Sequence, residues 1–105
     1  MGTMNYNKAI RDKIPEIIEK DGHKCDVRTL SDDEFLLKLE EKLLEELQEY
    51  QESKSIEELA DILEVIYRIS ELKGSSKQNL EEIRVKKAEN RGKFEKNLFL
   101  VESSD

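Results

Sequence analysis

Residues 41–67 read EKLLEELQEYQESKSIEELADILEVIY, and this stretch sets the architecture of the chain. Apolar residues recur every three or four positions on both sides of the polar break at 53–55, which predicts two amphipathic helices. Because the break is so short, the helices must run antiparallel as a hairpin. Both helices also crowd carboxylates one turn apart, although like charges at that spacing repel by about 0.2–0.5 kcal/mol per pair. The acids therefore face either water or a cation.

Further helices are predicted on both sides of the hairpin. A short helix lies within 11–22, with Pro15 in its first turn and Gly22 just past its end. Ser31 with Glu34, and Ser55 with Glu58, have capping-box spacing and open the two hairpin helices, which end near 52 and 73. A fourth helix covers about 76–91 and stops at Gly92.

The expected fold class is all-α, as one domain over residues 1–105, with 1–3 interpreted as a cloning remnant. Residues 24–30 and 97–102 are apolar or alternating segments that could add a minor two-stranded β element. A chain of this length has one small core and often completes it by oligomerising. Leu37 and Leu44 widen the apolar stripe of the first hairpin helix, so we expect a homodimer, or a dimer of dimers, with a four-helix bundle.

Composition excludes several classes of function. The net charge of −7 argues against binding to nucleic acid or to an acidic membrane. No apolar run approaches a membrane span, no secretory segment is evident, and a single cysteine cannot form an intramolecular disulfide, so a cytoplasmic protein is expected. One histidine and one cysteine are too few for a Cys/His zinc site. The remaining chemistry for which the chain has many residues is that of carboxylate groups.

A helical wheel directs one pair of carboxylates from each hairpin helix along the edge of its apolar face. Glu46 falls inside the apolar arc of the first helix, with Glu49 beside it. Glu58 and Asp61 occupy one flank of the second helix. On adjacent antiparallel helices the two pairs converge, and oxygen-only ligands suit a hard cation such as Mg²⁺ or Mn²⁺.

Glu46, Glu58 and the neighbouring Glu45 also have simpler explanations. Lys42 lies one turn before Glu46 and could pair with it. Glu58 is the third helical residue after Ser55, so a capping box alone could account for it. Glu45 could be an ordinary solvated acid. These alternatives remain open for single residues and weaken for the set as a whole.

The pattern E-x-x-E at Glu46–Glu49 followed by E-x-x-D at Glu58–Asp61 resembles the MazG-like all-α nucleoside triphosphate pyrophosphohydrolases, the superfamily that includes phosphoribosyl-ATP pyrophosphohydrolase. NKAIRDKIPEII, KLLEELQEY, EELADILEVI and KKAENRGKFEKNLFL are similar to four successive segments of its small members. The likeness extends from about Tyr6 to Val101. It implies hydrolysis between the α and β phosphates, giving a nucleoside monophosphate and pyrophosphate.

The resemblance also implies roles for individual residues. The metal ligands would be Glu46, Glu49, Glu58 and Asp61, and Glu45 would either support these ligands from behind or activate the attacking water. The substrate-binding residues would be Arg11, Lys42, Lys87 and Arg91, since cations should meet the triphosphate. Basic residues do gather at 8–13 and 84–96, away from the acidic stretch 40–64, although they could simply neutralise it.

Two other functions remain open from the sequence. The chain could act on phosphoribosyl-ATP alone, with the same fold and metal. It could instead be a non-catalytic acidic helical interaction module whose carboxylates serve solubility. Stabilisation by millimolar Mg²⁺ separates a preformed site from a solvated acidic face.

Overall fold

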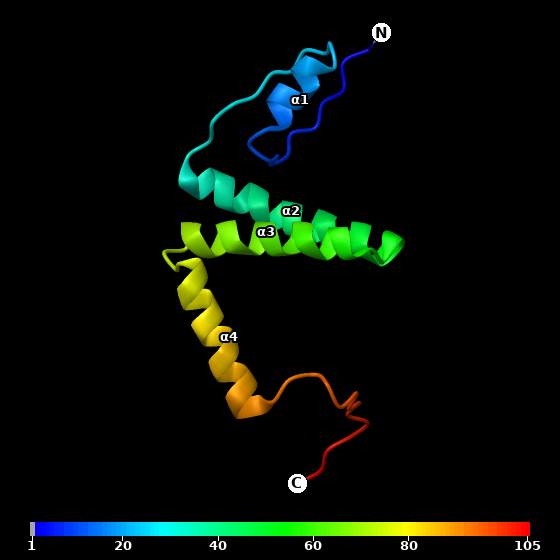
Figure 1. Ribbon diagram of the computed structural model, residues 1–105, viewed down its shortest axis with the longest axis vertical. Coiled ribbons are helices and arrows are strands. Elements are labelled where there is room, and N and C mark those ends of the chain that lie inside the picture. Colours follow the sequence, from blue (N-terminus) through cyan, green and yellow to red (C-terminus); the bar gives the residue numbers. More distant parts are fainter. Residues whose placement is uncertain (1) are drawn as a thin grey trace.

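The structure is a computed structural model that describes residues 2–105. It contains four helices: α1 (Ile14–Lys20), α2 (Asp32–Ser53), α3 (Ile56–Leu72) and α4 (Lys77–Arg91) (Figure 1). The all-α prediction is confirmed, and each helix ends within a few residues of its predicted position. Among the helices, contacts join only α2 to α3 and α3 to α4. The α2–α3 hairpin is therefore the centre of the molecule.

The hairpin connection consists of two residues, Lys54 and Ser55. Lys54 adopts a left-handed conformation, with φ of 58°, and its N–H donates to the carbonyl of Tyr50 at 2.7 Å. Ser55 is extended, and its hydroxyl accepts a hydrogen bond from the N–H of Glu58. Backbone groups at the end of α2 and at the start of α3 thus find hydrogen-bond partners within the connection itself, so two residues are enough to join the helices.

The core between α2 and α3 is small. Leu39 of α2 and Ile62 of α3 are buried, and Ala9 of the N-terminal segment is the remaining buried apolar side chain among the described residues. Ala9 precedes α1 and lines the same pocket as Phe35 and Leu39 of α2, so the N-terminal segment covers one side of the hairpin. A core of this size buries little apolar surface in a single chain.

The molecule is extended. In Figure 1, α1 lies on one side of the hairpin, whereas α4 and the C-terminal segment leave on the other side. The radius of gyration is 18.3 Å, whereas a compact chain of this length has about 13 Å. The accessible surface is 9911 Å², whereas a compact monomer of this mass exposes about 6,100 Å². The single chain thus leaves much of its surface uncovered.

The minor β element is not formed within the described chain. Residues 24–30 and 97–102 have no strand structure, and they lie toward opposite ends of the molecule (Figure 1). A strand needs a partner for its backbone N–H and C=O groups, and neither segment has one here.

Large apolar side chains remain exposed along the hairpin. Leu37 and Leu44 of α2 are each 64% exposed, and Ile56, Leu59 and Leu63 of α3 are also exposed. The width of the apolar stripe predicted from the sequence therefore exceeds what the neighbouring helix covers. None of the helices in residues 2–105 combines the length and the apolar character needed to cross a bilayer.

Candidate metal centre

Glu46 is the most buried charged side chain of the described chain. It is 5% exposed and lies on the face of α2 that packs against α3, as its position in the apolar arc predicted. One carboxylate oxygen pairs with Nζ of Lys42 at 3.2 Å. The other oxygen, Oε2, is buried without a hydrogen-bond partner. Lys42 therefore satisfies only half of this carboxylate.

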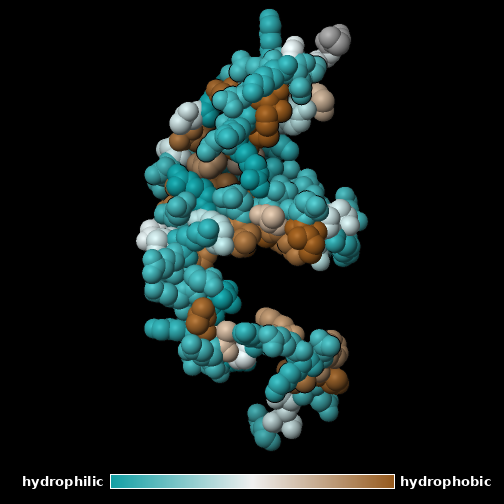
Figure 2. All heavy atoms as spheres, viewed as in Figure 1, coloured by the Kyte–Doolittle hydropathy of each residue, from teal (hydrophilic) through white to brown (hydrophobic). Residues whose placement is uncertain are grey.

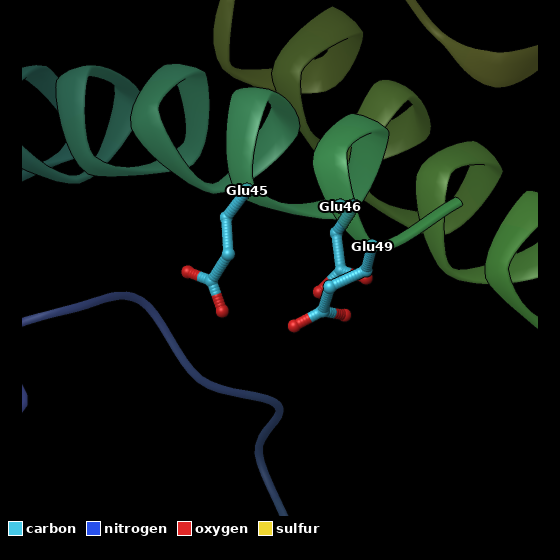
Figure 3. A group of neighbouring side chains, drawn as sticks. All are labelled: Glu45, Glu46 and Glu49. Carbon is cyan, nitrogen blue, oxygen red and sulfur yellow. The ribbon is translucent and has the colours of Figure 1, made fainter. Parts of the chain in front are cut away.

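Four further carboxylates surround Glu46. Oxygens of Glu45, Glu46 and Glu49 lie within 4.8 Å of one another, and so do oxygens of Glu46, Glu58 and Asp61. Figure 3 shows the three α2 side chains pointing to the same side of the helix, toward the N-terminal segment. The four acids predicted as metal ligands are thus brought together, with Glu46 common to both groups. We refer to these five residues as the carboxylate cluster.

Three cations neutralise part of the carboxylate cluster. Lys8 lies 3.0 Å from Glu45, Arg11 lies 2.6 Å from Asp61, and Lys42 lies between Glu45 and Glu46. Within residues 2–105, no cation lies at ion-pair distance from Glu49 or Glu58. If all five carboxylates are ionised, the three cations leave two negative charges, which a divalent cation would balance.

Glu58 does not use its carboxylate as a helix cap. The hydroxyl of Ser55 accepts from the backbone N–H of Glu58 at 3.4 Å, but the backbone N–H of Ser55 donates to Oγ of Ser53. The carboxylate of Glu58 instead lies in the carboxylate cluster, where Oε2 is buried and has no hydrogen-bond partner. The capping-box explanation therefore accounts for the serine and leaves the carboxylate unexplained.

The cluster perturbs the ionisation of its members in opposite directions. Desolvation, proximity to Glu46 and repulsion by Glu49 raise the pKa of Glu58 to about 7. Desolvation and the charge of Glu46 also raise the pKa of Glu49. The pKa of Glu45 is lowered, chiefly by its hydrogen bond from Lys8. Glu49 and Glu58 are thus the members that gain most from a further positive charge.

Lys42 responds to the same surroundings. Burial acts to lower its pKa, but hydrogen bonding to Glu46 and the charge of Glu45 outweigh burial, and the net pKa is raised. Lys42 therefore stays protonated, and it holds Glu45 and Glu46 on one side of the cluster.

The donor set fits a hard divalent cation. Buried oxygens of Glu46 and Glu58 lack any hydrogen-bond donor, and leaving such oxygens unsatisfied is costly. All five groups offer carboxylate oxygens, which Mg²⁺ and Mn²⁺ prefer. Acidic groups also cluster on protein surfaces without any ion, so the two buried, unpaired oxygens are the discriminating feature here.

A pocket of about 420 Å³ adjoins the cluster, between the N-terminal segment and the hairpin. Glu46 and Asp61 form part of its wall. Its basic lining residues are Arg11, Lys13, Lys42 and Arg68. Phe35, Leu39 and Val65 supply an apolar portion. The pocket thus combines carboxylates, cations and apolar surface.

The predicted substrate contacts divide into two groups. Arg11 and Lys42 lie at the cluster and the pocket. Lys87 and Arg91 lie on α4, which extends from the other side of the hairpin (Figure 1). A single chain therefore does not bring these two residues to the carboxylates.

Two residues at the site were not singled out from the sequence. Lys8 pairs with Glu45, and Arg68 lines the pocket. The gathering of basic residues at 8–13 was the available signal for Lys8. Arg68 pairs with Glu71 on its own helix at 3.6 Å.

Comparisons with protein-family models, with curated proteins and with solved structures gave no significant match to this chain.

Proposed function

We propose that the chain is a metal-dependent nucleoside triphosphate pyrophosphohydrolase that uses Mg²⁺ or Mn²⁺. The observation that carries the proposal is the pair of buried, unpaired oxygens of Glu46 and Glu58 within five converging carboxylates. The four-segment resemblance to MazG-like enzymes supplies the reaction class. The adjoining pocket, with its basic and apolar walls, gives space for a phosphate chain and an attached nucleoside.

Glu46, Glu49, Glu58 and Asp61 would hold the cation. A divalent cation in such a site neutralises charge on phosphate oxygens and increases the acidity of bound water. Arg11 and Lys42 lie beside these ligands and would hold phosphate oxygens on the pocket side. Arg11 would have to exchange its contact with Asp61 for one with substrate.

Glu45 is suited to orient the attacking water rather than to take up its proton. Its hydrogen bond from Lys8 lowers its pKa, so the carboxylate remains ionised and accepts hydrogen bonds. A general base works best with a pKa near the working pH, and a lowered pKa moves Glu45 away from that range.

Two other functions would use the same residues. An enzyme restricted to phosphoribosyl-ATP would share the fold and the metal, and would differ only in the substrates that it accepts. A non-catalytic acidic interaction module would need no cation at the cluster. The buried oxygens favour an ion over a solvated acidic face, because a solvated face leaves no carboxylate oxygen without water.

A nucleotide panel with Mg²⁺ or Mn²⁺ tests the proposed reaction. Several nucleoside triphosphates should each give the monophosphate and pyrophosphate. If the protein hydrolyses phosphoribosyl-ATP alone, the alternative of an enzyme restricted to that substrate is the correct one. Release of orthophosphate and a diphosphate would contradict the reaction class.

Substitutions in the cluster should remove this activity. Glu49→Gln and Asp61→Asn should each lower turnover at least about 100-fold, the scale expected when a group that stabilises transition-state charge is lost. Glu52→Gln is the matched control, because Glu52 is an exposed acid on the same helix. Circular dichroism should show unchanged helix content. Near-native turnover in either cluster variant would refute the ligand assignment.

The exposed hairpin leucines support assembly as a homodimer, or a dimer of dimers, in which the hairpins of two chains form a four-helix bundle. Light scattering at micromolar concentration should give at least twice the chain mass of 12.3 kDa. A monodisperse monomer that still hydrolyses nucleotides would exclude the bundle.

A further inference from the structure

The segment after α4, residues 92–101, is strongly apolar and almost fully exposed. We call it the C-terminal arm. Its large apolar side chains, Phe94, Leu98, Phe99, Leu100 and Val101, are 80–99% exposed. These five residues lie within eight positions of a chain in which 41% of the residues are charged. None of the five is covered by another part of the chain. Contiguous exposed apolar surface of this kind marks an interaction site.

The arm does not return to its own hairpin. Helix α4 contacts α3 but not α2, and it diverges so that a hollow of about 900 Å³ opens between Tyr67 of α3 and the side of α4 that carries Val85. Figure 2 shows a wide concavity bounded by the hairpin, α4 and the arm, with hydrophobic residues on the hairpin along its edge. An apolar hairpin face and an apolar arm thus border the same open space.

The uncovered surface is large enough for an extensive interface. The chain exposes 9911 Å², which is about 3,800 Å² more than a compact monomer of its mass. A standard interface covers only about 800 Å² on each partner, whereas obligate dimers bury several times more. A four-helix bundle alone would cover part of the hairpin and would leave the arm exposed.

Charge complementarity favours another copy of this chain as the occupant. Residues 40–64 of the hairpin contain ten acids and two lysines, whereas residues 84–96 of α4 and the arm contain six basic residues and two acids. The basic half of α4 and the arm is thus attracted to an acidic hairpin. Since the chain's own arm stays apart from its hairpin, the available acidic hairpin belongs to a second chain.

We propose that the C-terminal arm of each chain docks on the hairpin of a second copy, with the partner's hairpin held in the concavity. A two-fold axis makes the exchange reciprocal, so each hairpin is covered by its partner's hairpin on one face and by its partner's arm on another. This arrangement brings Lys87 and Arg91 of one chain to the acidic hairpin of the other. The proposal concerns assembly alone, and it stands whether or not the chain hydrolyses nucleotides.

Cross-linking tests the exchange directly. In a Cys25→Ser background, a chain with Leu44→Cys is mixed with a chain carrying Phe99→Cys, and a short bis-maleimide is added. A 44–99 linkage in this mixture joins two chains by construction, and mass spectrometry of the linked peptides identifies it. Ile17→Cys replaces Phe99→Cys in the control mixture, because Ile17 is also an exposed apolar residue but lies on α1.

The expected result is a 44–99 linkage at least ten times more abundant than the 44–17 linkage. A 44–99 yield no higher than the control would overturn the proposal. A double variant with both cysteines in one chain should give covalent dimers. An exclusively intramolecular 44–99 link in that variant would show that the arm folds back on its own hairpin, which also refutes the exchange.

Arm variants give an independent measurement. Phe99→Ser with Leu100→Ser should raise the dimer dissociation constant at least ten-fold in analytical ultracentrifugation, without loss of helix content, because the arm lies outside every helix. Met4→Ser is the control, as another exposed apolar residue at the opposite end of the chain. A wild-type monomer, or an unchanged dissociation constant in the arm variant, would exclude docking of the arm on a second copy.

Discussion

The two hairpin helices begin with the same pattern, serine followed three residues later by glutamate, yet the glutamates end in different places. At the start of α2, the hydroxyl of Ser31 accepts from the N–H of Glu34 at 3.2 Å and lies 3.0 Å from its carboxylate. At the start of α3, the hydroxyl of Ser55 accepts a hydrogen bond from the N–H of Glu58, while the carboxylate of Glu58 lies beside Glu46 and Asp61. The first glutamate completes a cap, and the second joins a cluster of like charges.

The difference shows which carboxylate has a local reason for its position. Glu34 gains a hydrogen bond within its own turn of helix. Glu58 gives up that bond, and its pKa rises to about 7 through desolvation and through its neighbours Glu46 and Glu49. An unfavourable arrangement of this kind is expected where a functional ligand compensates for it. Glu34→Gln and Glu58→Gln therefore form a matched pair of variants.

The largest difference between the Glu34→Gln and Glu58→Gln variants should be in how much a metal ion stabilises them. A saturating ion, at 100 times its dissociation constant, adds about 2.7 kcal/mol to the free energy of unfolding. Thermal unfolding with Mg²⁺ or with EDTA should show this gain in the wild type and in Glu34→Gln, and most of it should be lost in Glu58→Gln. Equal stabilisation of both variants would show that Glu58 does not hold the ion.

The next largest difference between the two variants should be in the pH dependence of their stability without metal. Because the pKa of Glu58 is raised to about 7 in the folded state, the native protein retains a proton that the unfolded chain releases above about pH 4.5. Stability in EDTA should therefore fall as the pH rises from about 4.5 to 7. The raised pKa of Glu49 acts in the same direction.

Urea unfolding at several pH values measures this dependence. Glu58→Gln should flatten the decline and be more stable than the wild type near pH 8, because it removes one of the crowded charges. Glu34→Gln should keep the wild-type slope. An unchanged slope in Glu58→Gln would place the perturbed titration elsewhere.

The serines should show the smallest difference. Ser31→Ala and Ser55→Ala each remove an N-cap hydroxyl, which costs about 1 kcal/mol of stability. Ser31→Ala should cost somewhat more, because the second contact of the Ser31 hydroxyl is with the charged Glu34 carboxylate, whereas that of the Ser55 hydroxyl is with the neutral hydroxyl of Ser53. Urea midpoints of the two variants give the comparison, and a larger loss in Ser55→Ala would mean that its cap is the stronger one.

Local features of the sequence predicted the helices well. Ser31, Ser55 and Gly92 mark helix ends that the structure places within a residue or two, and the two-residue connection forces the antiparallel hairpin. Apolar periodicity also placed Glu46 on the buried face of α2. These features were predictable because each depends on hydrogen bonds and side-chain positions within one or two turns of the chain.

Contacts between distant segments could not be obtained in this way. The sequence left the Glu58 carboxylate between a cap and the cluster, and the approach of α2 to α3 settled its position. The pairing of Lys8 and Arg11 with Glu45 and Asp61 spans 37 and 50 residues, and the position of α4 removes Lys87 and Arg91 from their own chain's carboxylates. Periodicity gives the direction of a side chain around its own helix, whereas distances between segments depend on how the whole chain packs.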